Sequence, residues 1–286
     1  MIAEPSLAAR VIVVGTDLSL GAQNALARAV DIGREQGATV EIVHAAAVPS
    51  PPALSVVDDD AAAIEARAAI EELAAEVRRS GVRAHLRLAD SSAVRGLRDA
   101  AAELAPDLVV VGARGRVVPD ALLGSTAERV ASGVRAPVLL VRRHASEAYR
   151  RVLLAIGSHG DVRRVVAAAS FVAPDADVGF LHAYEALHET TLMLQGTTQA
   201  SLSLYQRLAR REARAALVKR LDAAGVSDPH LVLRHGNRRL VLEREARRPS
   251  NDLLVLERSR SATRRFLLGS AARAVIAHGT TDVLLV

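Results

Sequence analysis

Several residue types that support particular chemistries are missing from this sequence. It has no cysteine and no tryptophan, and aromatic residues make up 2% of its 286 positions. Without cysteine, neither a disulfide nor a thiolate metal site can form. The sequence contains no uncharged apolar run of 18 or more residues, so we expect no membrane-spanning helix. The first residues show no basic segment followed by a long apolar one, so we expect a cytoplasmic protein without a signal peptide.

Lysine is also nearly absent, since Lys219 is the only one and arginine supplies the other cations. Residues 1–146 hold 16 Lys and Arg against 18 Asp and Glu, whereas residues 147–286 hold 21 against 14. A basic half can attract nucleic acid, but aromatic residues are scarce and no nucleic-acid module is present, so we expect no such partner. We interpret one basic cluster as a solvent-exposed helix face: Arg207, Arg210, Arg211 and Arg214.

The two halves repeat one pattern. "DLVVVGARGR" from Asp107 lines up with "DLLVLERSRS" from Asp252, and "LLGSTAERVASG" lines up with "LLGSAARAVIAH" at the same offset. The matches keep their order along the chain, which indicates duplication of a whole domain rather than a short repeat. We therefore predict one domain at residues 1–145 and a second at residues 146–286.

Apolar runs alternate with alanine-rich helical segments in both copies. Strands are expected at residues 11–15, 39–44, 84–88, 108–112 and 138–141, and helices at residues 20–35, 62–79, 93–104 and 126–132. In the second copy, strands are expected at residues 152–156, 178–182, 231–234, 253–256 and 283–286, and a long helix at residues 202–223. Continuous Val, Ile and Leu runs are typical of buried parallel strands. The sequence predicts an α/β protein of two tandem flavodoxin-like, doubly wound domains, each with a five-stranded parallel sheet.

The carboxyl ends of the first-copy strands carry a candidate ligand site, as doubly wound folds usually do. One strand ends just before Asp17, whose carboxylate can accept hydrogen bonds from a ribose or a base. Another ends at Gly112, followed by Gly115 and by Gly124-Ser125-Thr126 at the start of a helix. Glycine lets the backbone approach a phosphate, and a helix start favours an anion. These residues indicate a nucleotide site, although neither G-x-x-x-x-G-K-[ST] nor G-x-G-x-x-G after the first strand occurs.

At these residues the chain resembles the universal stress protein family, specifically its members with two tandem domains, over both halves. Nucleotide-binding members carry Gly-x2-Gly-x9-Gly-(Ser/Thr) after strand four, an aspartate after strand one and a small apolar residue on strand two. The resemblance implies ATP as the ligand, with or without magnesium. The residues it implies are Asp17 at the adenosine, Val43 at the adenine, and Gly112, Gly115, Gly124, Ser125 and Thr126 at the ribose and phosphates.

The phosphate loop departs from that pattern. Eight residues, Arg116 to Leu123, separate the second and third glycines where the family has nine, and Pro119 lies among them. The alternative to a nucleotide site is a shortened loop whose glycines serve only tight turns.

The second copy departs further. "RVLLAIGS" from Arg151 lines up with "RVIVVGTD" from Arg10, which matches Asp17 with Ser158. Glu257 stands for Gly112 and Arg260 for Gly115, so we expect a degenerate domain that does not bind ATP.

Two inferences follow from the Glu257 match. Because that copy keeps its framework without the early glycines, we infer that the fold does not require them and that a ligand does. We interpret the arginines nearby as an exposed basic loop: Arg258, Arg260, Arg264 and Arg265.

Other polar candidates have no partners that would make a site. His44 and His182 end the second strand of each copy, and we expect them to pack or to hydrogen-bond. No serine-histidine-aspartate signature and no metal-ligand cluster occurs. The segment from Ala47 to Asp60, with three prolines and three consecutive aspartates, predicts a surface loop or a flap over the nucleotide.

The sequence therefore predicts an ATP-binding regulatory protein that holds its nucleotide in the N-terminal domain only. The alternatives are an interaction scaffold of the same fold and a slow nucleotide hydrolase. We expect slow ATP hydrolysis at most, because no positioned base or activating lysine is evident. The expected partners are an adenine nucleotide and an unknown regulatory protein. Exposed apolar edge strands invite pairing. The family resemblance implies that the closing strands at residues 138–141 and 283–286 pair with each other within one chain, and a further dimer of chains is the other alternative.

Overall fold

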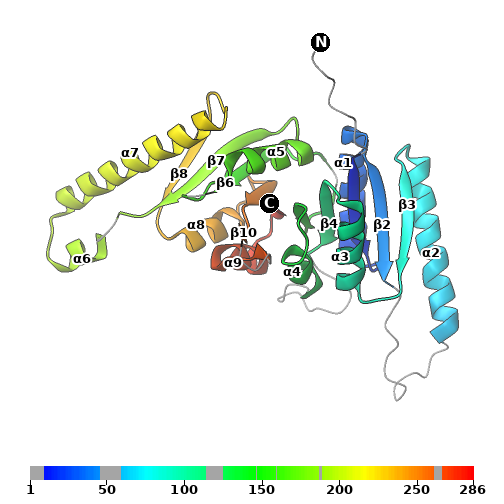
Figure 1. Ribbon diagram of the computed structural model, residues 1–286. Helices are drawn as coiled ribbons and strands as arrows, with labels where there is room; N and C mark the ends of the chain where they lie inside the picture. The colour runs from blue at the N-terminus through cyan, green and yellow to red at the C-terminus, as the bar shows by residue number, and fades with distance from the viewer. Residues whose placement is uncertain are drawn as a thin grey trace, which may run out of the picture. The chain divides into compact units, whose positions relative to one another are not determined.

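The computed structural model divides into two compact units, one formed mainly by residues up to Ala148 and the other mainly by residues from Tyr149 (Figure 1). The structure describes residues 10–45, 59–113, 125–145, 147–158, 160–186, 189–260 and 266–286.

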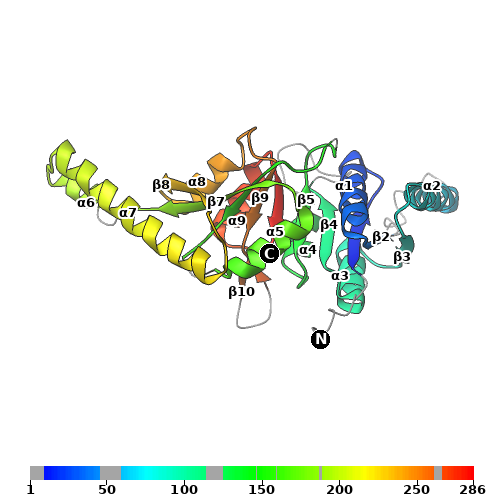
Figure 2. The same cartoon turned by 90° about the horizontal axis from the view of Figure 1, so that it is seen from above.

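The first unit is built on five parallel strands. These are β1 (Val11–Thr16), β2 (Thr39–Ala45), β3 (Ala84–Ala89), β4 (Leu108–Gly112) and β5 (Val138–Val141), in the order β3-β2-β1-β4-β5. The helices are α1 (Leu20–Gln36), α2 (Asp59–Arg79), α3 (Ala93–Leu104) and α4 (Ser125–Ala131). The strand order reverses between β1 and β4. Because all the crossover connections have the same handedness, α1 and α3 lie on opposite faces of the strands (Figure 2).

The core of this unit lies along β1 and β4. Ile12, Val13 and Val14 of β1 are fully buried, as are the first residues of β4. α1 begins at its cap Ser19, whose hydroxyl oxygen accepts the N–H of Ala22 at 3.2 Å. Local signals thus start the helix, and burial on both faces fixes the central strands.

The second unit repeats this plan with additions. Its strands are β6 (Arg151–Ala155), β7 (Asp177–Tyr184), β8 (His230–His235), β9 (Leu253–Leu256) and β12 (Asp282–Leu285), in the order β12-β9-β6-β7-β8. Its helices are α5 (Val162–Val172), α6 (Glu189–Leu194), α7 (Gln199–Ala223), α8 (Arg238–Glu245) and α9 (Ser270–His278). Between β9 and α9 along the chain, a separate two-stranded sheet joins β10 (Ser259–Arg260) and β11 (Phe266–Leu267), and residues Arg260–Leu267 are grouped with the first unit. The prediction of tandem doubly wound domains is confirmed; α6 and the β10–β11 pair are additions that the sequence did not predict.

Matching hydrogen bonds fix how the two copies align. Asp107 Oδ2 accepts the N–H of Val11 at 2.9 Å, and Asp252 Oδ2 accepts the N–H of Arg151 at 2.9 Å. The backbone N–H of each aspartate donates back to the carbonyl of the same partner. Val11 therefore corresponds to Arg151 and not to Val152, so the sequence alignment of the first strands was wrong by one residue.

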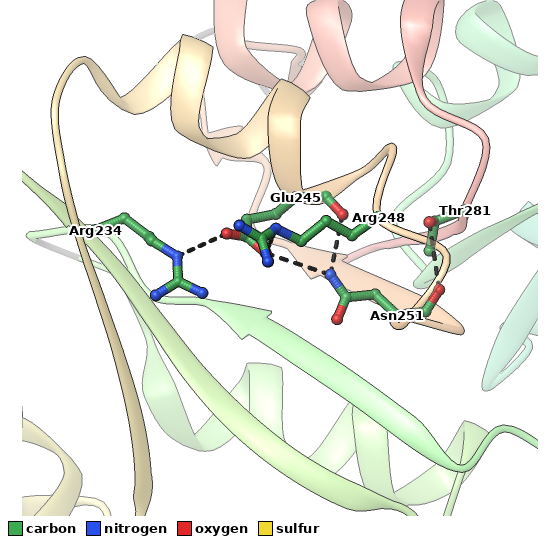
Figure 3. A network of polar contacts seen from close by, with 5 residues as sticks. All are labelled: Arg234, Glu245, Arg248, Asn251 and Thr281. Carbon is green, nitrogen blue, oxygen red and sulfur yellow. Dashed lines mark hydrogen bonds and ion pairs between the residues drawn. The ribbon is translucent and has the colours of Figure 1, made fainter.

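A buried carboxylate ties together three segments of the second unit (Figure 3). The side chain of Glu245 is 3% exposed and lies 2.7 Å from Arg234 Nε and 3.1 Å from Arg248 Nε. Asn251 Nδ2 donates to the Glu245 carbonyl at 3.0 Å, and Thr281 Oγ1 donates to the Asn251 carbonyl at 3.4 Å. The end of α8 is thereby fastened to β8 and to the turns that precede β9 and β12.

A second buried contact joins the start of this unit to its last strand. The hydroxyl of Tyr149 donates to Asp282 Oδ2 at 2.6 Å. Asp282 is fully buried and Tyr149 is nearly so. A hydrogen bond to a charged acceptor is stronger than one to a neutral acceptor. A buried carboxylate without a donor would be costly, so the Tyr149 hydroxyl stabilises the fold at this position.

Candidate functional site

The topological switch point of the first unit, where the strand order reverses, lies at the carboxyl ends of β1 and β4. Asp17 follows β1 directly. Its Oδ1 accepts the N–H of Ser19 at 3.0 Å, which forms a tight turn into α1. Thr16 Oγ1 accepts the N–H of Leu18 at 3.2 Å in the same turn. The structure thus places the predicted carboxylate, half-exposed, at the carboxyl edge of the sheet.

Leu18 adopts an unusual backbone conformation in this turn. Its φ is +62°, in the left-handed region that branched side chains seldom occupy. Such strain costs on the order of 1–3 kcal/mol and persists only where the surroundings impose it, often beside functional sites. Here it brings the side chain of Asp17 and the cap of α1 to the same edge.

Gly112, at the end of β4, is required by packing against α1. A Cβ at this position would lie 2.6 Å from the carbonyl oxygen of Gly21 and 2.7 Å from its carbonyl carbon. Backbone atoms cannot yield as a flexible side chain can, so the first unit needs glycine here with or without a ligand. The inference that the fold does not require this glycine was therefore wrong.

Val43 lies in the interior of the first unit. It is 2% exposed, and its Cγ1 lies 3.7 Å from where a Cβ on Gly96 of α3 would be. Ala45, two residues further along the same face of β2, is half-exposed and closer to the carboxyl edge.

The remaining predicted site residues are only partly described. Gly115 and Gly124 lie outside the described residues, as does most of the segment from Ala47 to Asp60. Ser125 is the first residue of α4, and Thr126 follows it with a half-exposed side chain.

The two strand-end histidines make the same backbone contact in each copy. Nδ1 of His44 lies 2.9 Å from the carbonyl oxygen of Thr16, and Nδ1 of His182 lies 2.9 Å from that of Ile156. A carbonyl can only accept, so Nδ1 carries the proton in both rings. The prediction of a packing or hydrogen-bonding role is confirmed.

The equivalent loop of the second unit is longer by two residues. Thr16 and Ile156 correspond through the histidine contacts, yet the helix cap is Ser19 in the first unit and Asp161 in the second. Gly157, rather than Ser158, therefore occupies the place of Asp17. No carboxylate follows the first strand directly here, because Asp161 comes five residues after Ile156 and caps α5.

Side chains of the second unit hold this longer loop. The guanidinium of Arg220 donates to the carbonyl oxygens of Gly157 and Gly160. Glu257, at the end of β9, uses Oε1 to accept the N–H of Asp161 at 2.8 Å. Arg238 lies so close that Nη1 would be 2.8 Å from a Cβ on Gly157. The switch point of this unit is occupied by its own charged groups.

Arg258 follows Glu257 and is 2% exposed, so the prediction of an exposed basic loop was wrong for this residue. Burial, together with the nearby charge of Arg164, lowers the pKa of Arg258 to about 9. Arg264 and Arg265 lie outside the described residues.

Two further searches bear on the site. Among the described residues, no group of three or more His, Asp or Glu side chains could hold a metal ion. None of the helices in those stretches is long and apolar enough to cross a membrane.

Comparison with known proteins identifies the family. The chain is similar to a universal stress protein from Archaeoglobus fulgidus DSM 4304, at 17% identity over 96% of this chain and 97% of that one, with a TM-score of 0.67. It is also similar to a functionally unknown protein from Pseudomonas aeruginosa PAO1, at 17% identity over 98% and 92%, with a TM-score of 0.63. No curated protein matches it.

These likenesses show the fold, and the family model adds the assignment. The universal stress protein family matches residues 9–142 and again residues 148–286. Because two successive matches span nearly the whole chain, it belongs to the universal stress protein family and carries that domain twice in tandem.

Proposed function

We propose that the first unit binds an adenine nucleotide, ATP foremost, at the carboxyl edge between β1 and β4, and that the second unit does not. In this proposal the nucleotide acts as a regulatory ligand rather than as a substrate for rapid turnover. Family membership and the position of Asp17 at the switch point support it.

The contrast between the two switch points carries the proposal. In the first unit, a half-exposed carboxylate stands directly after β1. In the second, Gly157 takes that place, Arg220 binds the loop carbonyls and Glu257 accepts a loop N–H. A phosphate brought to the second edge would meet the charge of Glu257, whereas a ribose brought to the first would meet a hydrogen-bond acceptor.

The side chains at the first edge fit the chemistry of a nucleotide. A carboxylate accepts from ribose hydroxyls, and a hydroxyl such as that of Thr126 can donate to phosphate oxygens. Magnesium would accompany a triphosphate and balance its charge. Ala45 is the described small residue best placed to border a base, since Val43 is buried beneath α3.

Isothermal titration with ATP and magnesium tests the proposal, using Asp17→Asn. Asparagine keeps the oxygen that accepts the Ser19 N–H, so the turn survives while the charge is lost. A charge-assisted hydrogen bond exceeds a neutral one by roughly 1 kcal/mol, so affinity should fall about fivefold to tenfold. Asp31→Asn removes an exposed carboxylate elsewhere on α1 and should leave affinity unchanged.

Stoichiometry supplies the other half of the test. One nucleotide per chain is expected, by titration and by mass spectrometry of the purified protein under native conditions. Two nucleotides per chain would refute the assignment to the first unit alone. No binding at millimolar ATP would leave the interaction scaffold as the function, and steady phosphate release lost in Asp17→Asn would favour the slow hydrolase.

A further inference from the structure

α7 carries leucines that the described part of the chain leaves uncovered. Leu204 is 52% exposed and Leu208 is 49% exposed. The buried residues of this helix are Leu202, Leu217 and Leu221, and two of these lie in its C-terminal half. In both views the N-terminal half of α7, together with α6, extends past the strands of its unit (Figures 1 and 2).

Positive charge borders these leucines. Arg207 and Arg211 lie three residues after Leu204 and Leu208 respectively, so they flank the same stripe. The exposed basic cluster of α7 comprises Arg207, Arg210, Arg211 and Arg214. None of the four makes a hydrogen bond or ion pair with any residue that the structure describes. Like charges three or four residues apart destabilise a helix, so an anionic partner would reduce the repulsion among these arginines.

α2, the corresponding helix of the first unit, has the opposite character. Its sequence holds six Asp and Glu against three Arg, whereas α7 holds six Arg and Lys against two Asp and Glu. Ile64 is 69% exposed on α2, and Ala68 follows it one turn later, also exposed. Glu65 and Glu76 are exposed and lie three helical turns apart, on one side of the helix.

We propose that α7 of one copy docks on α2 of a second copy of this chain. Leu204 and Leu208 pack on Ile64 and Ala68, and the basic cluster of α7 faces the glutamates of α2. Both an apolar contact and a complementary charge are available within the same molecule, which favours a second copy over lipid or nucleic acid. The two faces differ, so a twofold dimer makes the contact twice and an open assembly makes it once per copy.

Sedimentation velocity over a concentration series tests the proposal. The wild-type chain should self-associate at about 50 mM salt and less strongly at about 500 mM, where screening shortens the reach of charge. The double reversals Arg207→Glu with Arg211→Glu, and Glu65→Arg with Glu76→Arg, should each weaken association at least tenfold. Their circular dichroism and melting temperature should stay near wild type, which separates lost docking from lost folding.

Mixing the two variants is the sharpest experiment. The α7 variant keeps its acidic α2 but has an α7 without net charge, and the α2 variant keeps its basic α7 but has an α2 without its excess of acid, so neither variant keeps the charge complementarity needed to bind itself. In an equimolar mixture the unaltered α7 of one variant meets the unaltered α2 of the other, so that contact is complementary again and hetero-association should recover. The reversal of Arg239 and Arg244 to Glu on α8 changes net charge equally and should have no effect on self-association.

Three outcomes would overturn the proposal. These are a wild-type chain that stays monomeric at high concentration and low salt, variants that associate as the wild type does, and a mixture that stays monomeric. Binding of a monomeric wild type to vesicles of anionic lipid or to RNA, lost in the α7 variant, would assign the face to that partner instead.

Discussion

Glu257 Oε1 accepts the backbone N–H of Asp161 at 2.8 Å, so a side chain from the end of β9 caps the loop that leads into α5. The corresponding residue of the first unit is Gly112, which makes room for the backbone of Gly21. The same topological position therefore serves close packing in one copy and loop capping in the other. The loop after the first strand is two residues longer in the second unit. This difference explains why a capping side chain serves the second unit and a close glycine contact serves the first.

Glu257→Ala should destabilise the second unit. The substitution leaves a loop N–H without its charged acceptor, and for a half-exposed group the cost is about 1 kcal/mol. Urea unfolding would measure it. Nucleotide stoichiometry should stay at one per chain, because Arg220 still holds the loop. A second equivalent of bound ATP in this variant would show that Glu257 alone closes the site.

Gly112→Ala should lower the free energy of unfolding of the first unit by about 2–3 kcal/mol, since the added methyl meets backbone rather than side chain. Gly269→Ala is the matched control. Its backbone φ is −61° and a Cβ there meets nothing within 4 Å. Gly269 caps α9 with its backbone only, so alanine should cost at most about 1 kcal/mol, through its weaker N-cap preference. Equal melting temperatures for both variants would contradict the packing argument. Gly112 substitutions are consequently poor tests of nucleotide binding.

Glu245→Ala should be among the more damaging substitutions in the second unit. It leaves Arg234 and Arg248 without their shared carboxylate. Because both arginines can reach water, the loss should be about 2 kcal/mol, as for a hydrogen bond to a charged group. Glu243→Ala removes a carboxylate paired with the more exposed Arg247 and should cost under about 1 kcal/mol. Chemical denaturation of both variants gives the comparison, and a smaller loss for Glu245→Ala than for Glu243→Ala would count against the network.

The fold was predictable where local signals and burial agree. The helix expected at residues 93–104 is α3, and the expected central strands match β1 and β4 closely. The position of Asp17 at the carboxyl edge of the sheet was also predictable from its place after a buried strand. The turn around it depends on neighbours one and two residues away, and such signals are readable in sequence.

The features that could not be predicted depend on contacts between residues that lie far apart in the sequence. Gly112 meets Gly21 only after the strands have assembled, and a glycine in sequence does not reveal which atoms approach it. The alignment of the copies failed by one residue because both strands begin with similar apolar runs, and only the bonds from Asp107 and Asp252 fix the register. Arg258 is surface-like by residue type, yet it is buried beside β9.

The pKa of Glu103 offers a test on the first unit. Two hydrogen bonds from the Arg87 guanidinium, at 2.7 and 3.0 Å, lower the pKa of this carboxylate. The folded value lies below the unfolded one, so the stabilisation is present above the unfolded pKa and is lost as pH falls through the folded pKa. Arg87→Gln should raise the pKa of Glu103 toward its ordinary value, as nuclear magnetic resonance titration can measure. An unchanged titration would mean that the pair does not persist in solution.

The contact between Tyr149 and Asp282 also gives the chain a built-in optical probe. Tryptophan is absent, and the tyrosines are Tyr149, Tyr184 and Tyr205, all within the second unit. Ultraviolet emission excited in tyrosine therefore originates in the second unit alone, and the buried ring of Tyr149 must change its surroundings when that unit unfolds. Circular dichroism follows both units. Recording the two signals in one melt would separate the transitions of the two copies without any label.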